Sequence, residues 1–233
     1  MMISILKNGV LTIVAILSLI IICCNNKIKQ KKGNEVVFNR TYESSKSAYE
    51  VAIETLNELR NSKTDTIIFY KRTCISCCDF YYIFWASKGK KFIDKFYNDD
   101  ATHFLRINLS DDKIIKEFSE NYDSLKNSSV KENRHTEADG ITSGNNLDHY
   151  CYVRLIIYSN YDSIHFTATD HDFDKYVEYD FDSGQSKTHN DNYQENVNSK
   201  WNALLIIIEN QIAALPQTNQ REISALRMGE RSQ

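Results

Sequence analysis

Four of the six cysteines have the clearest capacity for chemistry in this chain. Cys74, Cys77 and Cys78 lie close together, and Cys151 follows much later. A cysteine thiolate can attack a disulfide, bind a metal ion or be oxidised to a structural disulfide, and each role requires different neighbouring residues. The cluster begins shortly after an apolar, β-branched segment at 66–70, which predicts a strand. These cysteines therefore suggest three hypotheses, and the surrounding sequence distinguishes between them.

The first hypothesis is a redox-active dithiol. A strand at 66–70 followed by the C-x-x-C spacing of Cys74 and Cys77 resembles a thioredoxin-like site, in which a helix N-terminus lowers the pKa of the first thiol. The resemblance implies a thiol–disulfide oxidoreductase. Two features oppose it. Residues 80–85 favour a strand where that family has a helix, and the only proline, Pro216, follows the last predicted helix instead of lying beside the dithiol.

The second hypothesis is a metal centre built from the same four cysteines, with His149 close to Cys151. Zinc sites usually take pairs of ligands from tight turns, whereas Cys151 is a single residue on a predicted strand. The third hypothesis, which we favour, is structural disulfide bonding in an oxidising compartment among Cys74, Cys77, Cys78 and Cys151. Four cysteines allow three pairings, and the sequence leaves the choice open. We therefore expect no metal, no cofactor and no catalytic residue.

The N-terminal residues predict where the chain is sent. Lys7 precedes an uncharged, mostly apolar run from Val10 to Ile22, and the run ends at Cys23 and Cys24. This order resembles the signal of bacterial lipoproteins, and the resemblance implies a lipidated cysteine in the cell envelope. Cys24 is the better acceptor, because a small residue precedes it whereas the bulky Ile22 precedes Cys23. We expect Cys24 to carry the lipid anchor, with palmitate among its acyl chains.

Two alternatives for this segment stay open. An uncleaved transmembrane anchor normally needs about 20 apolar residues, which is more than this run provides. The second alternative is plain secretion after cleavage of the segment. For an uncleaved anchor, the lysines that follow the run argue against an N-terminus on the cytoplasmic side, because positive charge is expected on that side of the membrane. We expect a membrane-anchored protein that faces the periplasm or the cell surface.

The composition excludes several classes of function. The net charge is −3, and apart from the lysines that follow the N-terminal apolar run the sequence has no long run of one charge sign. We therefore expect no nucleic-acid partner. The chain has only 7 glycines and no phosphate-cradling glycine-rich loop, so we expect no nucleotide. Serine-hydrolase and metalloprotease motifs are also absent from the sequence.

The apolar periodicity predicts an α+β domain with a mainly antiparallel sheet of two strand-rich halves, packed by about three helices. The helices are expected at 44–60, 111–126 and 197–215. The strands are expected at 66–70, 81–86, 91–97, 104–109, 150–158, 163–168 and 176–181. A hairpin turn at 87–90 should place Gly89 at a positive φ.

The distribution of polar residues predicts the organisation of the chain. We expect a signal and anchor at 1–24, a polar tether at 25–41, a single domain at 42–216 with a mobile loop at 127–147, and a disordered tail at 217–233.

Asp170, Asp172 and Asp174 alternate as in a calcium-binding loop. Lys175 and Phe181, however, stand where such a loop needs glycine and glutamate, so we expect a solvated acidic loop.

The tether and the lack of catalytic motifs favour a non-enzymatic binding module. Its partner, which we expect to be a protein, would contact an exposed face of the sheet or the loop at 127–147. The alternative is a thioredoxin-like thiol–disulfide oxidoreductase that uses Cys74 and Cys77. A strand at 79–86 would favour the binding module, and a helix there would favour the oxidoreductase.

Overall fold

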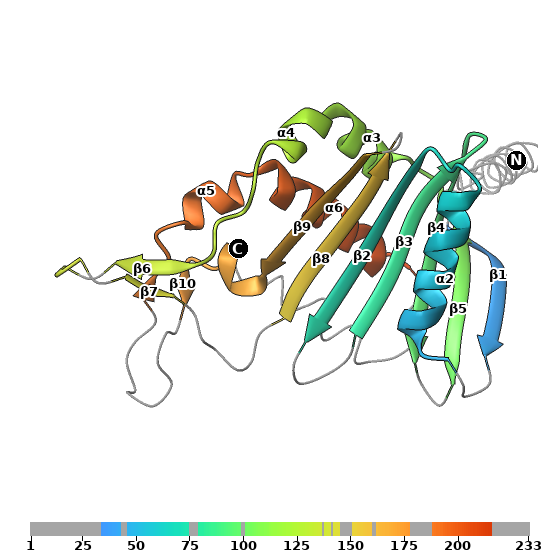
Figure 1. The fold of residues 1–233 in the computed structure, drawn as a ribbon, viewed down its shortest axis with the longest axis horizontal. Coiled ribbons are helices and arrows are strands. Elements are labelled where there is room, and N and C mark those ends of the chain that lie inside the picture. The colour runs from blue at the N-terminus through green and yellow to red at the C-terminus, as the bar shows by residue number, and fades with distance from the viewer. Residues whose placement is uncertain are drawn as a thin grey trace, which may run out of the picture. The chain divides into compact units, whose positions relative to one another are not determined.

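Seven antiparallel strands form the sheet on which the rest of the domain packs (Figure 1). The computed structural model describes residues 34–42, 46–74, 79–98, 101–136, 138–140, 142–144, 151–159, 162–177 and 188–215, all within the unit that starts at Asn34. In spatial order the strands are β1 (Glu35–Tyr42), β5 (Thr102–Asn108), β4 (Lys90–Asn98), β3 (Asp79–Ser87), β2 (Thr66–Cys74), β8 (Cys151–Ser159) and β9 (Asp162–Thr169). The prediction of an α+β domain with a mainly antiparallel sheet is confirmed.

Strand β1 lies inside the segment that we expected to be a polar tether. It pairs antiparallel with β5 along its length, with a bulge between Val36 and Phe38. Valine and phenylalanine favour strands, so this short apolar group gains more from pairing with the sheet edge than from remaining in solvent. The tether expected at 25–41 therefore does not include residues 35–41, which belong to the sheet.

The β3–β4 hairpin has the turn that the sequence predicts. Ser87 pairs with Lys90, and the two residues between them, Lys88 and Gly89, have φ angles of 51° and 73°. Two positive φ angles match the twist of the flanking strands in a two-residue hairpin. The prediction for Gly89 is confirmed, and Lys88 adopts the left-handed conformation despite its side chain.

Helix α2 (Ala48–Asn61) begins at a capping box. Ser47 Oγ accepts a hydrogen bond from the backbone N–H of Glu50 at 3.2 Å, and Glu50 Oε2 accepts one from the backbone N–H of Ser47 at 2.7 Å. The helix packs on β2, β3, β4 and β5 through a buried stripe at three- and four-residue spacing. This stripe consists of Ala48, Val51, Ala52, Thr55, Leu56 and Leu59.

Three helices cover the other face of the sheet: α3 (Lys113–Glu120), α4 (Tyr122–Lys126) and α6 (Lys200–Ala213). Their apolar side chains and those of the strands form the larger of two core clusters, in which Trp201, Leu204 and Ile208 are almost fully buried. The helix expected at 111–126 is divided at Asn121. Within the described residues no helix combines the length and the apolar character needed to cross a bilayer.

Short elements form an extension beside β9. They are β6 (Arg134–Thr136), β7 (Thr142–Gly144), a 3₁₀ turn η1 (Asp170–Phe173), β10 (Tyr176–Val177), β11 (Thr188–His189) and α5 (Tyr193–Val197). Of the strand expected at 176–181, the described part is β10, and the rest lies outside the described residues.

Part of the segment expected to be a mobile loop at 127–147 is structured. The reason is a network of buried amides. Asn196 accepts from the backbone N–H of Lys131 and donates to its carbonyl, and Asn192 donates to the carbonyl of Glu132 at 2.8 Å. These bonds satisfy the backbone of a segment that has little apolar surface to bury, so hydrogen bonding holds it in place of a hydrophobic core.

Candidate functional site

Cys74 and Cys151 form a disulfide between neighbouring strands. They stand directly opposite each other in the β2–β8 pairing, with Cα atoms 4.1 Å apart, and both are buried. A disulfide within the predicted set of four cysteines is thus present, and it joins the segment before the hairpin to the strand at 150–158. Cys77, Cys78 and His149 lie outside the described residues, as do Cys23 and Cys24.

The chain after this cluster forms a strand. β3 spans Asp79–Ser87 and pairs with β2 and β4, so a strand occupies the position where a thioredoxin-like site has a helix. Cys74 itself is the last residue of β2 and is not at a helix N-terminus. Neither feature supplies the helix dipole that lowers a thiol pKa in such sites.

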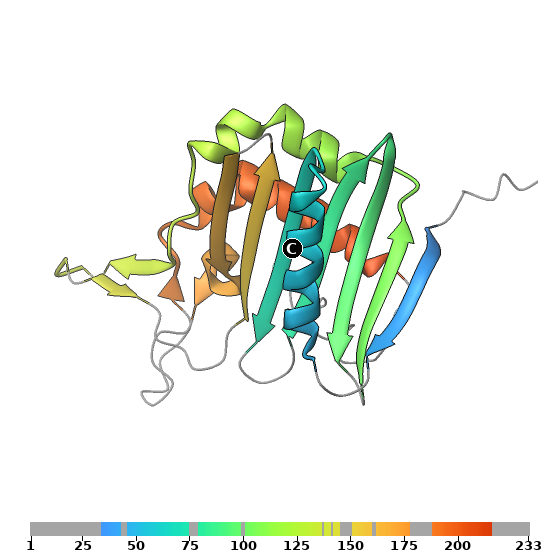
Figure 2. The ribbon, with the colours of Figure 1, turned by 45° about the vertical axis from the view of Figure 1, so that its right-hand side comes forward.

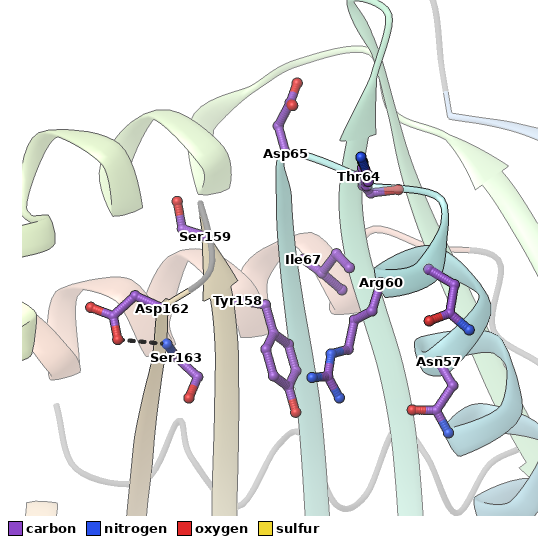
Figure 3. Close-up of a pocket in the computed structure, with 11 residues that line it drawn as sticks. Asn57, Arg60, Thr64, Asp65, Ile67, Tyr158, Ser159, Asp162 and Ser163 are labelled. Carbon is purple, nitrogen blue, oxygen red and sulfur yellow. Dashed lines mark hydrogen bonds between the residues drawn. The ribbon is translucent and has the colours of Figure 1, made fainter.

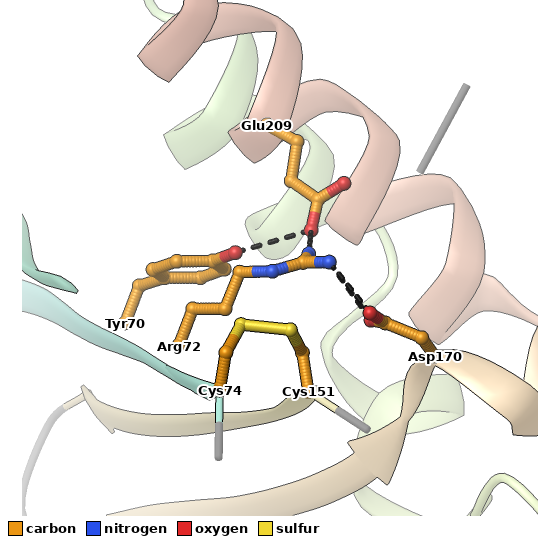
Figure 4. The surroundings of a disulfide bond; sticks show 6 residues. All are labelled: Tyr70, Arg72, Cys74, Cys151, Asp170 and Glu209. Atoms are coloured by element: carbon orange, nitrogen blue, oxygen red, sulfur yellow. Dashed lines mark hydrogen bonds and ion pairs between the residues drawn. A yellow bond between two sulfur atoms is a disulfide. The ribbon is translucent and has the colours of Figure 1, made fainter. Parts of the chain in front are cut away.

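Beside the disulfide, Arg72 is buried between two carboxylates (Figure 4). Its guanidinium donates to Glu209 of α6 at 2.8 Å and to both carboxylate oxygens of Asp170 at 2.8 and 2.9 Å. The hydroxyl of Tyr70 donates to the same Glu209 oxygen at 3.1 Å. Arg72 is only 2% exposed, so this group joins β2, η1 and α6 through a buried cation.

Burial raises the pKa of Asp170 to about 6, with Glu209 adding to the effect, although the nearby Arg72 favours the ionised carboxylate. Burial likewise raises the pKa of Tyr70. The guanidinium of Arg72 has two ionic partners, and the cluster is closed to solvent around it. We therefore assign a structural role to this cluster.

A second buried ion pair lies on the α2 face of the sheet. Asp94 is fully buried and accepts from Arg106 at 2.7 and 2.8 Å and from Trp85 Nε1 at 3.1 Å. Burial raises the pKa of Asp94 even though Arg106 opposes the shift. Trp85 and Trp201 are both buried.

The alternating acids do not form the solvated loop that we expected. Asp172 is buried and accepts hydrogen bonds from the backbone N–H groups of Asn133 at 2.7 Å and Thr169 at 2.6 Å. Asp170 binds Arg72, and Asp174 contacts His171 at 3.1 Å. Each carboxylate thus has its own protein partner. Within the described residues no three histidine, cysteine or acidic side chains are placed to hold a metal ion.

Helix α2 leaves part of its face of the sheet uncovered. Helix α2 packs on β2, β3, β4 and β5, and in Figures 1 and 2 β8 and β9 lie to one side of it, beyond β2. We call the uncovered surface of β8 and β9 the open face. Its exposed or half-buried residues are Tyr152, Arg154, Ile156, Ser163, His165 and Thr167. The open face combines hydroxyl groups, a guanidinium and an imidazole with the large side chains of Tyr152 and Ile156.

A cavity of about 560 Å³ lies at one end of the open face, between the C-terminal end of α2 and the neighbouring ends of β8 and β9 (Figure 3). We call it the α2 pocket. Arg60 of α2 lies over the ring of Tyr158, with Cζ 4.4 Å from the ring centroid. Besides Arg60 and Tyr158, the α2 pocket is lined by Asn57, Asn61, Lys63, Thr64, Asp65, Ile67, Ser159, Asp162 and Ser163.

Sequence reasoning did not find Arg72 or Arg60. A charged residue at an inward position of a strand, in step with Ile68, Tyr70 and Cys74, would have indicated a buried ion pair at Arg72. Arg60 belongs to the polar side of α2. The sequence prediction of this helix rested on its apolar positions alone, so Arg60 was not identified. No protein-family model, curated protein or solved structure matches the chain, so these features carry the functional argument by themselves.

Proposed function

We propose that the protein is an envelope-tethered lipoprotein that acts as a non-enzymatic binding module, and that the open face is its contact surface for a protein partner. The observation that carries the proposal is the incomplete cover of the sheet by α2. Three helices cover one face, whereas the single helix on the other leaves β8 and β9 exposed. A sheet face that no other described element covers is available to a partner in a way that the closed face is not.

The chemistry of the open face suits protein recognition. Tyr152 and Arg154 belong to the residue types that contribute most to binding energy at protein interfaces. Arg154 is exposed and pairs with no acidic group of the described residues. Nearby, Lys71 of β2 lies over the rings of Tyr49 and Tyr81 at 5.2 and 5.5 Å, which extends the cationic and aromatic character toward α2.

We also propose the finer description of the sheet as two strand-rich halves, β1–β5 and β8–β9. The pairing of β2 with β8 and the bridge from Cys74 to Cys151 would be their junction. In this description the second half carries the open face, and the first half carries the helix beside it.

The alternative is a thiol–disulfide oxidoreductase that uses Cys74 and Cys77. Strand β3, which lies where a thioredoxin-like site has a helix, supports the binding module over this alternative, and the Cys74–Cys151 bridge is compatible with both. Turnover of insulin or of a small disulfide substrate by the purified protein would support the enzyme.

Site-specific photocrosslinking in native membranes tests the contact surface. A benzophenone amino acid at His165 or Thr167, both exposed on β9, should give a discrete crosslinked product. The same group at Lys116 or Glu120, exposed on α3, should give none. Equal products from the two pairs of positions, or none from β9, would contradict the proposal.

The anchor requires a separate test. Cys24→Ser should abolish acyl labelling and release the protein from membranes, whereas Cys23→Ser should leave both unchanged. A mature protein that begins elsewhere, or that retains residues 1–22, would show the lipoprotein assignment to be wrong.

A further inference from the structure

The α2 pocket contains a guanidinium with no ionic partner in the described part of the chain. Arg60 contacts the Tyr158 ring face at 4.4 Å, and no described carboxylate forms a salt bridge with it. Stacking on an aromatic ring holds a guanidinium in one orientation without using its N–H donors. Arg60 therefore lies in a cavity with its hydrogen-bonding capacity available.

The same stretch of α2 supplies neutral polar groups beside this cation. Asn57, Arg60 and Asn61 are related by three- and four-residue steps, so they share one side of the helix, as Figure 3 shows for the labelled pair Asn57 and Arg60. Ser159 and Ser163 line the cavity from β8 and β9. The volume of about 560 Å³ is in the range of small-molecule sites.

The charge balance in the pocket is positive. Asp162 accepts hydrogen bonds from Lys126 and from the hydroxyl of Tyr122, and these contacts lower its pKa to about 2, Lys126 having the larger effect. Its charge is thus compensated by groups of α4. Arg60 and Lys63 remain in the pocket against one carboxylate, Asp65, that pairs with no described cation.

The end of α2 places Lys63 beside the cavity in a conformation that costs free energy. Lys63 has a φ of 55°, in the left-handed region where glycine is usual after a helix. Its N–H donates to the Arg60 carbonyl at 3.1 Å, and the N–H of Thr64 donates to the Leu59 carbonyl at 3.2 Å. A lysine here is less favourable for the turn than glycine, but it adds a second cation to the pocket lining.

We propose that the α2 pocket binds the oxyanion group, carboxylate or phosphate, of a small polar molecule, and that Arg60 is its principal contact. A guanidinium offers parallel N–H donors that match two oxygens of either group. The side-chain amides and hydroxyls of the wall would bind the uncharged polar part of the molecule. This inference goes beyond the proposed docking of a protein on the open face and does not depend on it.

The test is a titration of the full-length protein in detergent, at an ionic strength held constant with sodium chloride, followed by NMR of the Arg60 side-chain N–H and the Ser163 amide. The probes are inorganic phosphate, citrate and glucose 6-phosphate, with glucose as the uncharged control. At least one anionic probe should give saturable shifts with a Kd of about 1 mM or tighter. Comparison of phosphate and citrate shows which oxyanion the pocket prefers.

Two variants make the result specific. Arg60→Gln should weaken binding at least about tenfold, because it removes the charge-assisted bonds. Arg134→Gln, exposed on β6 and outside the pocket, should leave the Kd unchanged. Absence of saturable shifts with every probe, or equal weakening by both variants, would overturn the proposal. Thermal unfolding of Arg60→Gln close to that of the parent protein checks that its fold is intact.

Discussion

Two arginines on opposite sides of the sheet, Arg72 and Arg60, have opposite surroundings. On the face covered by α3, α4 and α6, Arg72 is 2% exposed and bonded to Glu209 and Asp170. On the face of the single helix α2, Arg60 is exposed, lies on the ring of Tyr158 and has no described ionic partner. The first arginine is enclosed by the fold, and the second is presented to a cavity.

The difference shows how a fold can separate stability from recognition. A buried charge needs partners that compensate it, and both terminal nitrogens of Arg72 bind carboxylates. Its Nε has no hydrogen-bond partner among the described residues, but it is buried and closed to solvent. An exposed guanidinium contributes little to stability but keeps its donors available. The Arg72 cluster therefore helps to hold the domain together, whereas Arg60 keeps its donors available for the ligand that we propose.

The largest effect should come from removing the buried cation. Arg72→Met leaves Asp170 and Glu209 close together without their counterion, which should lower the free energy of unfolding by about 3 to 5 kcal/mol. The matched control, Arg154→Met on the open face, should stay within about 0.5 kcal/mol of the parent protein. Urea denaturation measures both. Equal midpoints for the two variants would show that burial of Arg72 is not what distinguishes the faces.

Loss of the disulfide should come next. Cys74→Ser combined with Cys151→Ser should lower the stability by about 2 to 5 kcal/mol, because the bridge restricts an unfolded chain over a separation of 77 residues. The parent protein should show no reductase turnover with insulin as substrate. Measurable turnover, lost in a variant that melts like the parent, would instead support the oxidoreductase.

The closed face should also impose a pH dependence. Because the pKa of Asp170 is about 6 in the folded protein and near 3.8 when unfolded, the folded state binds the proton more tightly. Stability should therefore fall by about 1 to 3 kcal/mol as the pH rises from about 4 to 6.

Asp170→Asn keeps an oxygen that can accept from Arg72 but cannot ionise, so its stability should change less over this range. Urea midpoints at several pH values measure the difference between the variant and the parent. Identical pH profiles for the two proteins would show that Asp170 does not titrate in this range.

The smallest effect concerns the hairpin that both faces share. Gly89→Val should destabilise the domain by more than about 1 kcal/mol, since a β-branched residue is strained at a φ of 73° although the added side chain meets no atom within 4 Å. Lys90→Val, at the next position in β4, should cost less. Thermal melts of both variants test this. A larger fall in melting temperature for Gly89→Val than for Lys90→Val indicates backbone strain at Gly89, whereas equal falls would indicate an effect of the exposed apolar side chain alone.

Local features of the fold could be predicted from the sequence. Ser47 begins α2 because its side chain can accept from the third residue beyond it, and Gly89 marks the hairpin because glycine tolerates positive φ. Apolar, β-branched and aromatic segments predicted six of the seven sheet strands, because such composition is a property of short stretches of chain. Strand β1 was missed because its short apolar group is embedded in a polar segment and gains order only by pairing with β5.

The amide network illustrates the limit of composition as evidence. Asn190, Asn192 and Asn196 look like residues of a solvated segment, but in the fold they satisfy backbone groups of distant strands and turns. The polar sequence at 127–147 was therefore expected to be a mobile loop, although part of it is held by hydrogen bonds that the sequence does not reveal.

By itself, the sequence determined the class of fold, most of the strands, the hairpin turn and a set of cysteines able to pair, because each depends on neighbouring residues. Only the tertiary structure decided that Cys74 pairs with Cys151, that Arg72 meets a glutamate 137 residues away, and that Arg60 lies on Tyr158. Those contacts depend on the register of β2 with β8 and on the placement of α2 and α6. Register and helix placement are set by the packing of the whole core, which no local pattern encodes.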